Sequence, residues 1–530
     1  MTLEIYLDAN ATSQALPAAV AAAVDAMQAR FGNPSSSHGA GLRARAVLDA
    51  TRASARRVIG AGAGRLLFTS GATEAIQTAV LSALCALRQR QLAGQAVGDL
   101  LVYGATEHKA IAESLAHWNA ILGTGCTLVE LAVDADGRHR IAELAALAPR
   151  TVLLCTMAAN NETGVVTDLA AIDAVLRALA PQALWLVDCV QALGKLPLDL
   201  AATRIDYAPF SGHKLYAPKG IGMLYVRDDA PFTPLMVGGG QEGALRAGTE
   251  NMAGIAAFGA VLVALEEGTT LRSPAALAAL RARLAAALSA SFPGLQWNAP
   301  MTHSLPTTLN FCVPGAASNL LLNVFDAAGV RVSAGSACSA AKAAPSHVLL
   351  AMGLAPERAA SAVRLSFSPT ASDAFIDAAC ARIARCGAAL SSHAPSAAPQ
   401  VTAARPAAAA GSAACTVAAD ATDAADAAAS IAGADLAAFL QRHPAARLVD
   451  VREGVEHAAA ALGHWHGRAV ASLPLSHLPQ QLDAGLDPQE GPLVLFCRSG
   501  NRSLQALHML RDAGHKNVYH LAGGVALALP

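Results

Sequence analysis

The chain has 530 residues, a formal net charge of −1 and a hydrophobic fraction of 54 %, much of it alanine. This length is too great for one ordinary core and predicts about three or four domain-sized units. The balance of 38 basic and 39 acidic residues argues against a nucleic-acid binder, and the most apolar long stretch, 252–265, is too short to span a bilayer.

The cysteines and the N-terminal residues indicate a reducing compartment. No two of the 10 cysteines have C-x-x-C spacing, so no metal site is predicted. His464 and His466 stand two apart without further ligands, which is a weak metal signal. The first twelve residues lack the basic and apolar regions of a signal peptide. We therefore expect a cytoplasmic protein with free thiols.

Residues 1–388 alternate short apolar runs with Ala/Leu-rich helical patterns. The runs at 65–69, 101–103, 151–155 and 184–188 have the length of buried strands. Their βαβα rhythm predicts an α/β fold with a mostly parallel sheet covered by helices. In such sheets ligands bind beyond the carboxyl ends of the strands, so polar residues directly after the runs are the candidates for a site.

A change of composition separates a second domain from the first. Residues 389–430 are rich in Ala, Ser, Pro, Thr and Asp, which is typical of a linker, although an Ala-rich helix packed on the first domain is an alternative. Residues 431–530 return to an α/β pattern, with strands expected at 447–451, 492–496 and 517–520. About 100 residues suit one small domain.

Four strand ends in the first domain carry polar groups that fit a pyridoxal phosphate (PLP) site. Around Thr73, backbone N–H groups and a hydroxyl at a helix start would hold a phosphate. His108 follows the second strand, and Asp188 ends another, where a carboxylate would keep a pyridine nitrogen protonated. Lys214 stands among small polar residues and could form the internal Schiff base. Each signal is weak alone, and the combination carries the prediction.

A series of motifs in the first domain resembles that of the cysteine desulfurases, which belong to the class-V aminotransferases. The motifs are SGATE, TEHKA, NNETGVV, VDCVQALGKLPLD, SGHKLYAPKGIG, LRAGTEN and SAGSACS, and the resemblance covers residues 4 to 386. It implies the PLP-dependent transferase fold type I, in which a large domain with a mostly parallel sheet precedes a smaller α/β domain.

The resemblance also implies a role for each matching residue. Lys214 would be the Schiff-base lysine, with Asp188 facing the pyridine nitrogen. His108 would stack on the ring and help to move protons, and Gln191 would face the ring hydroxyl. Thr73, Ser211 and His213 would hold the cofactor phosphate, and Ala72 and Asn161 are also expected to bind the cofactor.

Two further implications concern the partner subunit and the substrate. Thr249, in LRAGTEN, would reach the phosphate of a partner subunit, which implies a homodimer. Asn161 and Arg364 would bind the carboxylate of L-cysteine, and the planar guanidinium of an arginine suits a carboxylate on geometric grounds.

Cys338 is the expected nucleophile, because sulfur removal needs a thiolate that attacks the substrate's own sulfur. Its neighbours are small and polar, as in a loop that carries a reactive group. The expected products are L-alanine and a persulfide on Cys338. The loop resembles that of the NifS and IscS group, with departures at Ser339 and Ala340. A further departure, Gly243, precedes the motif LRAGTEN. A selenocysteine lyase, or a sulfur carrier with a silent PLP domain, stays open as an alternative.

The run from Cys497 to Arg502 resembles the active loop of a single-domain rhodanese, and the match spans about 435 to 527. A thiol at a helix N-terminus, among backbone N–H groups, is well placed to hold anionic sulfur. Four residues separate Cys497 from Arg502, whereas related phosphatase loops have five, so the loop fits sulfur rather than phosphate. The loop residues are Cys497, Arg498, Ser499, Gly500, Asn501 and Arg502.

Together these motifs predict an enzyme that extracts sulfur from L-cysteine at Cys338 and passes it to Cys497. The relay is inferred from the fusion of the two domains. The expected acceptors are proteins of iron–sulfur cluster assembly or of thiolation, with no direct nucleic-acid or membrane partner.

Overall fold

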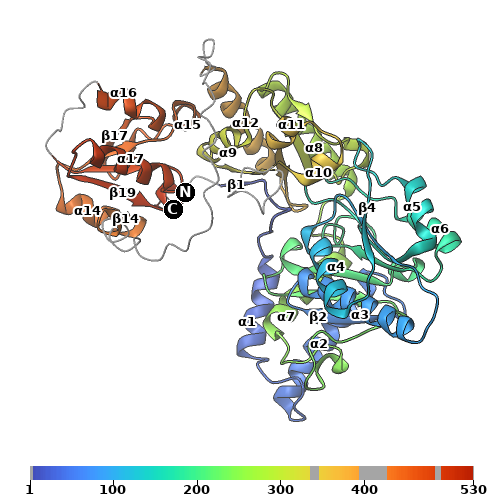
Figure 1. The fold of residues 1–530 in the computed structure, drawn as a ribbon. Coiled ribbons are helices and arrows are strands. Elements are labelled where there is room, and N and C mark those ends of the chain that lie inside the picture. The colour runs from blue at the N-terminus through green and yellow to red at the C-terminus, as the bar shows by residue number, and fades with distance from the viewer. Residues whose placement is uncertain (1–3, 335–344, 393–425, 484–490, 529–530) are drawn as a thin grey trace, which may run out of the picture. The chain divides into compact units, whose positions relative to one another are not determined.

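The structure is a computed structural model that describes residues 4–334, 345–392, 426–483 and 491–528. Two compact units make up the chain (Figure 1). The larger comprises Tyr6–Asn319 and Arg331–Asp377, and the other comprises Met1–Ile5, Leu320–Val330 and Ala378–Pro530.

A seven-stranded sheet forms the centre of the larger unit, in the order β2-β8-β7-β6-β5-β3-β4. Strand β8 is antiparallel to both neighbours, and the remaining pairs are parallel, so the predicted mostly parallel sheet is confirmed. The strands are β2 (Arg65–Thr69), β3 (Leu100–Gly104), β4 (Thr127–Leu131), β5 (Thr151–Met157), β6 (Leu184–Asp188), β7 (Tyr207–Ser211) and β8 (Gly222–Val226).

Helices cover both faces of this sheet, which explains why its strands are continuously apolar. Trp185 and Val187 of β6 face one core, whereas Leu186 between them faces the other. Such two-sided burial is what parallel sheets require. The helices are α1 (Pro17–Gln28), α2 (Gly39–Val58), α3 (Ala72–Leu92), α4 (Lys109–Leu122), α5 (Ile141–Leu147), α6 (Leu169–Leu179) and α7 (Met252–Glu267).

A smaller antiparallel sheet, in the order β12-β13-β10-β9, lies in the same unit. Its strands are β9 (Gln296–Trp297), β10 (Thr308–Cys312), β12 (Ser333–Ala334) and β13 (Val363–Ser366). A two-stranded sheet joins β1 (Ile5–Tyr6) to β11 (Val330–Arg331). The remaining helices of this part of the sequence are α8 (Pro274–Ser291), α9 (Ser318–Ala327), α10 (His347–Ala351), α11 (Pro356–Ala360) and α12 (Asp373–Ser392).

The second α/β domain is built on a six-stranded sheet in the order β14-β19-β18-β15-β17-β16. Only the β16–β17 pair of this sheet is antiparallel, and an apolar core lies on each face. The strands are β14 (Ser430–Ala432), β15 (Arg447–Asp450), β16 (His464–Trp465), β17 (Arg468–Ser472), β18 (Leu493–Phe496) and β19 (Val518–Ala522). The helices are α14 (Leu436–Arg442), α15 (Gly454–Ala459), α16 (Leu478–Asp483), α17 (Asn501–Asp512) and α18 (Gly524–Ala528).

The predicted strands agree with the observed ones in place and type. Those expected at 65–69 and 184–188 coincide with β2 and β6, and 492–496 differs from β18 by one residue. Among the described residues, none of the helices combines the length and the apolar character needed to cross a bilayer.

Candidate active sites

A cavity of about 640 Å³ opens at the carboxyl ends of the central strands of the larger unit. It brings together residues from strand ends that are far apart in the sequence, as the α/β pattern predicted. The sequence-predicted residues that line it are Ala72, Thr73, His108, Asn161, Asp188, Gln191, Ser211, His213, Lys214 and Arg364.

One end of the cavity is formed by the start of α3. Gly71 precedes this 21-residue helix, and Ser70, Gly71 and Thr73 all line the cavity. The backbone of Gly222 packs directly against the backbone of Gly71. This contact requires glycine at 222, because a Cβ there would lie 2.7 Å from the Gly71 Cα. A helix start with exposed N–H groups is a natural phosphate site.

Lys214 lines the same cavity and lies in the short 3-10 turn Gly212–Lys214 that follows β7. Its Nζ donates hydrogen bonds to the backbone carbonyls of Asn10 at 2.6 Å and Ala11 at 2.7 Å. Two carbonyl acceptors hold the amine at the cavity wall.

Asp188 presents a buried carboxylate at the end of β6. Its Oδ1 accepts a hydrogen bond from the Val190 N–H at 2.9 Å. Burial raises the pKa of this carboxyl to about 6, although that hydrogen bond and the charge of Lys214 act in the opposite direction. A desolvated carboxylate gains from a positive partner, so it suits a protonated ring nitrogen.

Glu107 is a second buried acid beside this site. Burial and the neighbouring Asp188 raise its pKa well above the ordinary value. Its Oε1 accepts a hydrogen bond from the Met157 N–H at 2.6 Å, and its Oε2 has no hydrogen-bond partner in the described structure. Burial and the charge of Asp188 both favour the neutral form of the Glu107 carboxyl.

Two of the histidines that line the cavity, His108 and His213, are shifted toward the neutral form. Burial lowers the pKa of His108, and the positive charge of Lys214 adds to this effect. His108 is also the N-cap of α4, and its Nδ1 accepts a hydrogen bond from the Ala110 N–H at 3.2 Å. Its Nε2 therefore carries the proton. Burial lowers the pKa of His213 to about 4, and its Nδ1 lies 3.2 Å from the Thr12 Oγ1.

Arg364 comes from β13 and is 1 % exposed. Its Nη2 donates to Asp8 Oδ1 at 2.6 Å, and its Nη1 donates to the Asn161 carbonyl at 3.0 Å. Its Nε is buried and finds no acceptor among the described residues. An unsatisfied guanidinium N–H at a cavity wall indicates a place for an anionic group.

Asn10 and Lys195 are polar residues of this region to which the sequence assigned no role, although Lys195 lies within the motif VDCVQALGKLPLD. Asn10 lies in the N-terminal segment, and its backbone carbonyl accepts from both Lys214 and Gln191. The Nζ of Lys195 contacts the side chains of Asn10 and Gln191. Burial, together with the charges of Lys214 and Arg364, lowers the pKa of Lys195 to about 7. Asn10 lies outside the quoted motifs and has no sequence signal of its own, whereas the position of Lys195 four residues after Gln191 in a quoted motif was a signal that could have been used.

These groups fit pyridoxal phosphate. The start of α3 offers N–H groups for a phosphate, Asp188 offers a buried carboxylate for the ring nitrogen, and Lys214 offers an amine at the cavity wall. All three border one cavity. The roles of the individual residues remain proposals.

Two of the predicted residues are not among those that line this cavity. Thr249 is exposed and borders a second cavity of about 160 Å³, which shares Ser70 and Gly220 with the first. It does not line the cavity that contains Lys214, so a contact with the phosphate of its own chain is not expected. Cys338 lies outside the described residues.

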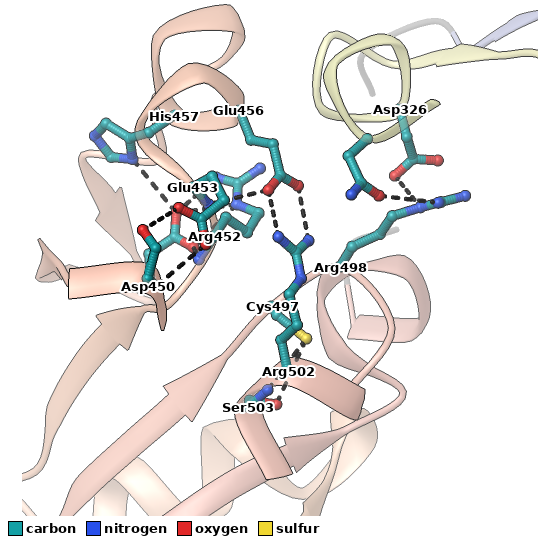
Figure 2. Close-up of polar contacts among 12 residues, drawn as sticks. Asp326, Asp450, Arg452, Glu453, Glu456, His457, Cys497, Arg498, Arg502 and Ser503 are labelled. Carbon is teal, nitrogen blue, oxygen red and sulfur yellow. Dashed lines mark hydrogen bonds and ion pairs between the residues drawn. The ribbon is translucent and has the colours of Figure 1, made fainter. Parts of the chain in front are cut away.

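In the second α/β domain, Cys497 follows β18 and immediately precedes the turn into α17 (Figure 2). It is 1 % exposed. Its Sγ accepts hydrogen bonds from the N–H of Gly500 at 3.2 Å and of Ser503 at 3.4 Å, and it lies 3.7 Å from the Ser503 Oγ. This ring of donors can stabilise an anionic sulfur, as predicted from the loop.

Buried ion pairs fix the surroundings of the loop (Figure 2). Arg502 donates to both carboxylate oxygens of Glu456, at 2.5 and 2.8 Å. Arg452 pairs in the same way with Asp450, which is 0 % exposed. Each of these two guanidinium groups is already neutralised by a buried carboxylate. Their role is therefore to stabilise the structure of the domain around the loop.

The short helix α18 also supports the Cys497 loop. The Val525 N–H donates to the Cys497 carbonyl at 2.9 Å. A Cβ on Gly524 would lie 2.2 Å from that same carbonyl oxygen, so the contact requires glycine. Within the described parts of the chain, no group of three or more His, Cys, Asp or Glu residues could hold a metal ion.

A mostly parallel sheet that gathers a lysine, a buried aspartate and an open helix start into one cavity defines a PLP-dependent enzyme. Residues 5–378 match the family "Aminotransferase class-V", and residues 433–527 match "Rhodanese-like domain". The chain thus belongs to the class-V aminotransferases, with the cysteine desulfurases as its relatives, and carries a C-terminal rhodanese-like domain. Its cofactor is pyridoxal phosphate.

Characterised relatives cover most of the first domain. A cysteine desulfurase of Gluconacetobacter diazotrophicus is 38 % identical over 380 residues, which are 70 % of this chain and 90 % of that protein. A cysteine desulfurase IscS of Anaeromyxobacter dehalogenans is 37 % identical over 386 residues, covering 71 % and 91 %.

Solved structures agree with this assignment. A NifS-like protein superimposes with a TM-score of 0.64 at 30 % identity and covers 72 % of this chain and 98 % of its own. DndA from Streptomyces lividans does so with a TM-score of 0.55 at 33 % identity, covering 68 % and 99 %.

Proposed function

We propose that the first domain converts L-cysteine to L-alanine and takes the sulfur onto Cys338 as a persulfide. The observation that carries this proposal is the cavity in which the amine of Lys214, the carboxylate of Asp188 and the unpartnered Nε of Arg364 meet. The cysteine desulfurases among the relatives support the choice of substrate.

Each side chain of the cavity would have a separate role in the reaction. Arg364 would bind the substrate carboxylate through its Nε, with Asn161 beside it. Asp188 would hold a proton on the ring nitrogen of the cofactor. Lys214 would take the proton from the α-carbon, and neutral His108 would donate one through its Nε2. When bound, pyridoxal phosphate supplies an electron sink for the α-carbon of the substrate.

The sulfur step belongs to Cys338. Its thiolate would attack the sulfur of the substrate, so that a sulfur–sulfur bond forms and the carbon–sulfur bond breaks. The electron pair of the broken bond stays with the carbon skeleton, which takes up protons and leaves as alanine. The balance is one L-cysteine consumed, one alanine released and one persulfide formed on the enzyme.

We further propose that the sulfur moves on to Cys497 of the rhodanese-like domain. The thiolate of Cys497 would attack the outer sulfur of the Cys338 persulfide, and Cys338 would leave as a thiolate. The donors around the Cys497 Sγ support this step, because they would stabilise the new anionic persulfide. The final acceptors would be proteins of iron–sulfur cluster assembly or of thiolation in the cytoplasm.

Mass spectrometry of persulfides after exposure to L-cysteine tests both steps. We expect persulfide on Cys338 and on Cys497 in the unaltered chain, and loss of the second in a Cys338→Ala variant. Persulfide on Cys338 alone would reject the relay and keep the desulfurase. A chain without persulfide on Cys338 would reject the desulfurase proposal itself.

We also propose that the enzyme is a homodimer. Helix α1 carries exposed apolar side chains one turn apart at Val20, Val24 and Met27, and Phe31 just after it is 70 % exposed. An apolar stripe of this kind is typical of an interface. The exposed position of Thr249, outside the cavity of its own chain, is compatible with a role at a partner's phosphate. Light scattering on the unaltered chain and on a Phe31→Asp variant tests the proposal, and a monomeric unaltered chain would reject it.

A further inference from the structure

Lys195 occupies an enclosed position behind the wall of the PLP cavity. The residue as a whole is only partly buried, but its Nζ contacts the side chains of two buried residues, Asn10 and Gln191. The Nζ donates to the Gln191 Oε1 at 2.6 Å and to the Asn10 Oδ1 at 3.1 Å. A cation in such a place is expensive to desolvate, which calls for a reason beyond packing.

These contacts fix the orientation of the Gln191 side-chain amide. An ammonium only donates, so the Gln191 atom that faces Lys195 must be the carbonyl oxygen. The amide nitrogen then points the other way, where it donates to the Asn10 carbonyl at 3.1 Å. One of its two N–H groups is used in this contact. The second is available toward the cavity that Gln191 lines.

Asn10 is held in a matching orientation. Its side-chain nitrogen donates to the Asn161 carbonyl at 3.2 Å and to the Thr308 Oγ1 at 3.0 Å, which leaves its Oδ1 for Lys195. Its backbone carbonyl accepts from Gln191 and from Lys214. Each of the two amides that contact Lys195 thus donates to a backbone carbonyl, which can only accept, and turns its oxygen toward the Lys195 Nζ.

We propose that Lys195 is a positioning residue that keeps Gln191 as a hydrogen-bond donor toward the ring oxygen of the cofactor. The proposal rests on the assignment of Gln191 to that oxygen. A fixed donor stabilises the deprotonated ring oxygen, whereas an amide that is free to turn would also present its carbonyl and favour the protonated form. Lys195 acts through Gln191 and touches neither cofactor nor substrate.

The test uses the full chain, stripped of cofactor and titrated with pyridoxal phosphate without L-cysteine. In Lys195→Met we expect the dissociation constant for pyridoxal phosphate to rise roughly tenfold, as for the loss of one hydrogen bond to a charged oxygen. We also expect the absorbance to shift toward the form with a protonated ring oxygen. The control is Thr308→Val, which removes another contact of Asn10 and should leave the absorbance bands unchanged.

A double-mutant cycle separates positioning from general structural support. In a Gln191→Met background, Lys195→Met should cause no further change in affinity or absorbance. An equal effect with and without Gln191 would overturn the proposal, as would unaltered spectra in Lys195→Met.

If Lys195→Met does not fold, Gln191→Glu supplies the test. A carboxylate presents only acceptors to the ring oxygen, so Gln191→Glu should bind the cofactor more weakly than Gln191→Met, and equal affinities would contradict the proposal. Because every readout omits L-cysteine, failure here leaves the desulfurase reaction untouched, and failure of sulfur transfer leaves this test valid.

Discussion

Replacing Arg364 by lysine should raise KM for L-cysteine far more than it lowers kcat. Lysine keeps a positive charge beside Asp8, which Arg364 contacts at 2.6 Å. It removes the Nε, the one guanidinium nitrogen that is buried without any acceptor in the described structure. We expect the substrate carboxylate to accept a hydrogen bond from this nitrogen. The variant should therefore bind the substrate more weakly and keep its folded structure.

The size of the effect follows from the bond that is lost. A hydrogen bond to a charged group contributes about 1.5–3 kcal/mol, which corresponds to about a 10- to 150-fold rise in KM. Full truncation to alanine would also leave Asp8 unpaired, and breaking a buried pair costs about 3–5 kcal/mol in stability. For this reason Arg364→Lys is the cleaner variant.

The assay is the rate of alanine release over a range of L-cysteine concentrations. Arg358→Lys is the matched control, because Arg358 also donates through its Nε, at 2.8 Å to the Asn298 Oδ1, and does not line the cavity. It should keep the KM of the unaltered chain. A KM for Arg364→Lys within twofold of the control would refute the assignment of the carboxylate to Arg364.

The remaining predictions concern four residues. The raised pKa of Asp188 means that the folded, cofactor-free protein binds this proton more tightly than the unfolded chain, so its contribution to stability should grow as pH falls from about 6 toward 4. Asp188→Asn should accordingly raise the melting temperature of the cofactor-free protein at pH 7.5 and weaken binding of pyridoxal phosphate; a lower melting temperature would contradict this reasoning. Cys338→Ala should abolish alanine release and keep the cofactor absorbance, and normal alanine release would exclude Cys338 as the nucleophile. Cys497→Ser should leave the first turnover of alanine unchanged in a rapid-quench measurement, whereas a slower first turnover would place Cys497 in the desulfurase step. Glu456→Gln should destabilise the rhodanese-like domain by about 3 kcal/mol, seen as faster hydrogen exchange in 493–522, because Arg502 loses its buried counter-charge; unchanged exchange would show that the pair is dispensable.

The fold and most of the cavity could be predicted because their determinants are local in sequence. A buried strand that ends in a polar residue, such as the one that ends at Asp188, signals both its own structure and its place at the carboxyl edge of the sheet. The same holds for Lys214 after β7 and for Cys497 after β18. In each case the reactive side chain stands, in the sequence, at the end of the strand that positions it or just after that end.

Residues whose role depends on distant contacts could not be found in this way. The contacts of Asn10 with Gln191 and Lys214 join positions 181 and 204 residues apart, and nothing near Asn10 announces them. Glu107 became informative only when its burial beside Asp188 was known. His108 has a second function as the N-cap of α4, and this function likewise depends on where the helix begins.

The pairing of Asp8 with Arg364, 356 positions apart in the sequence, has a consequence for how the protein is made. The Asn10 N–H similarly donates to the Ser366 Oγ, so the wall of the cavity joins the first residues of the chain to residues near the end of the first domain. During synthesis the nascent chain carries Lys214 long before Arg364 has left the ribosome. Capture of the cofactor in its final environment must therefore follow completion of the whole first domain, and the yellow colour of the bound cofactor would report a finished fold rather than an early intermediate.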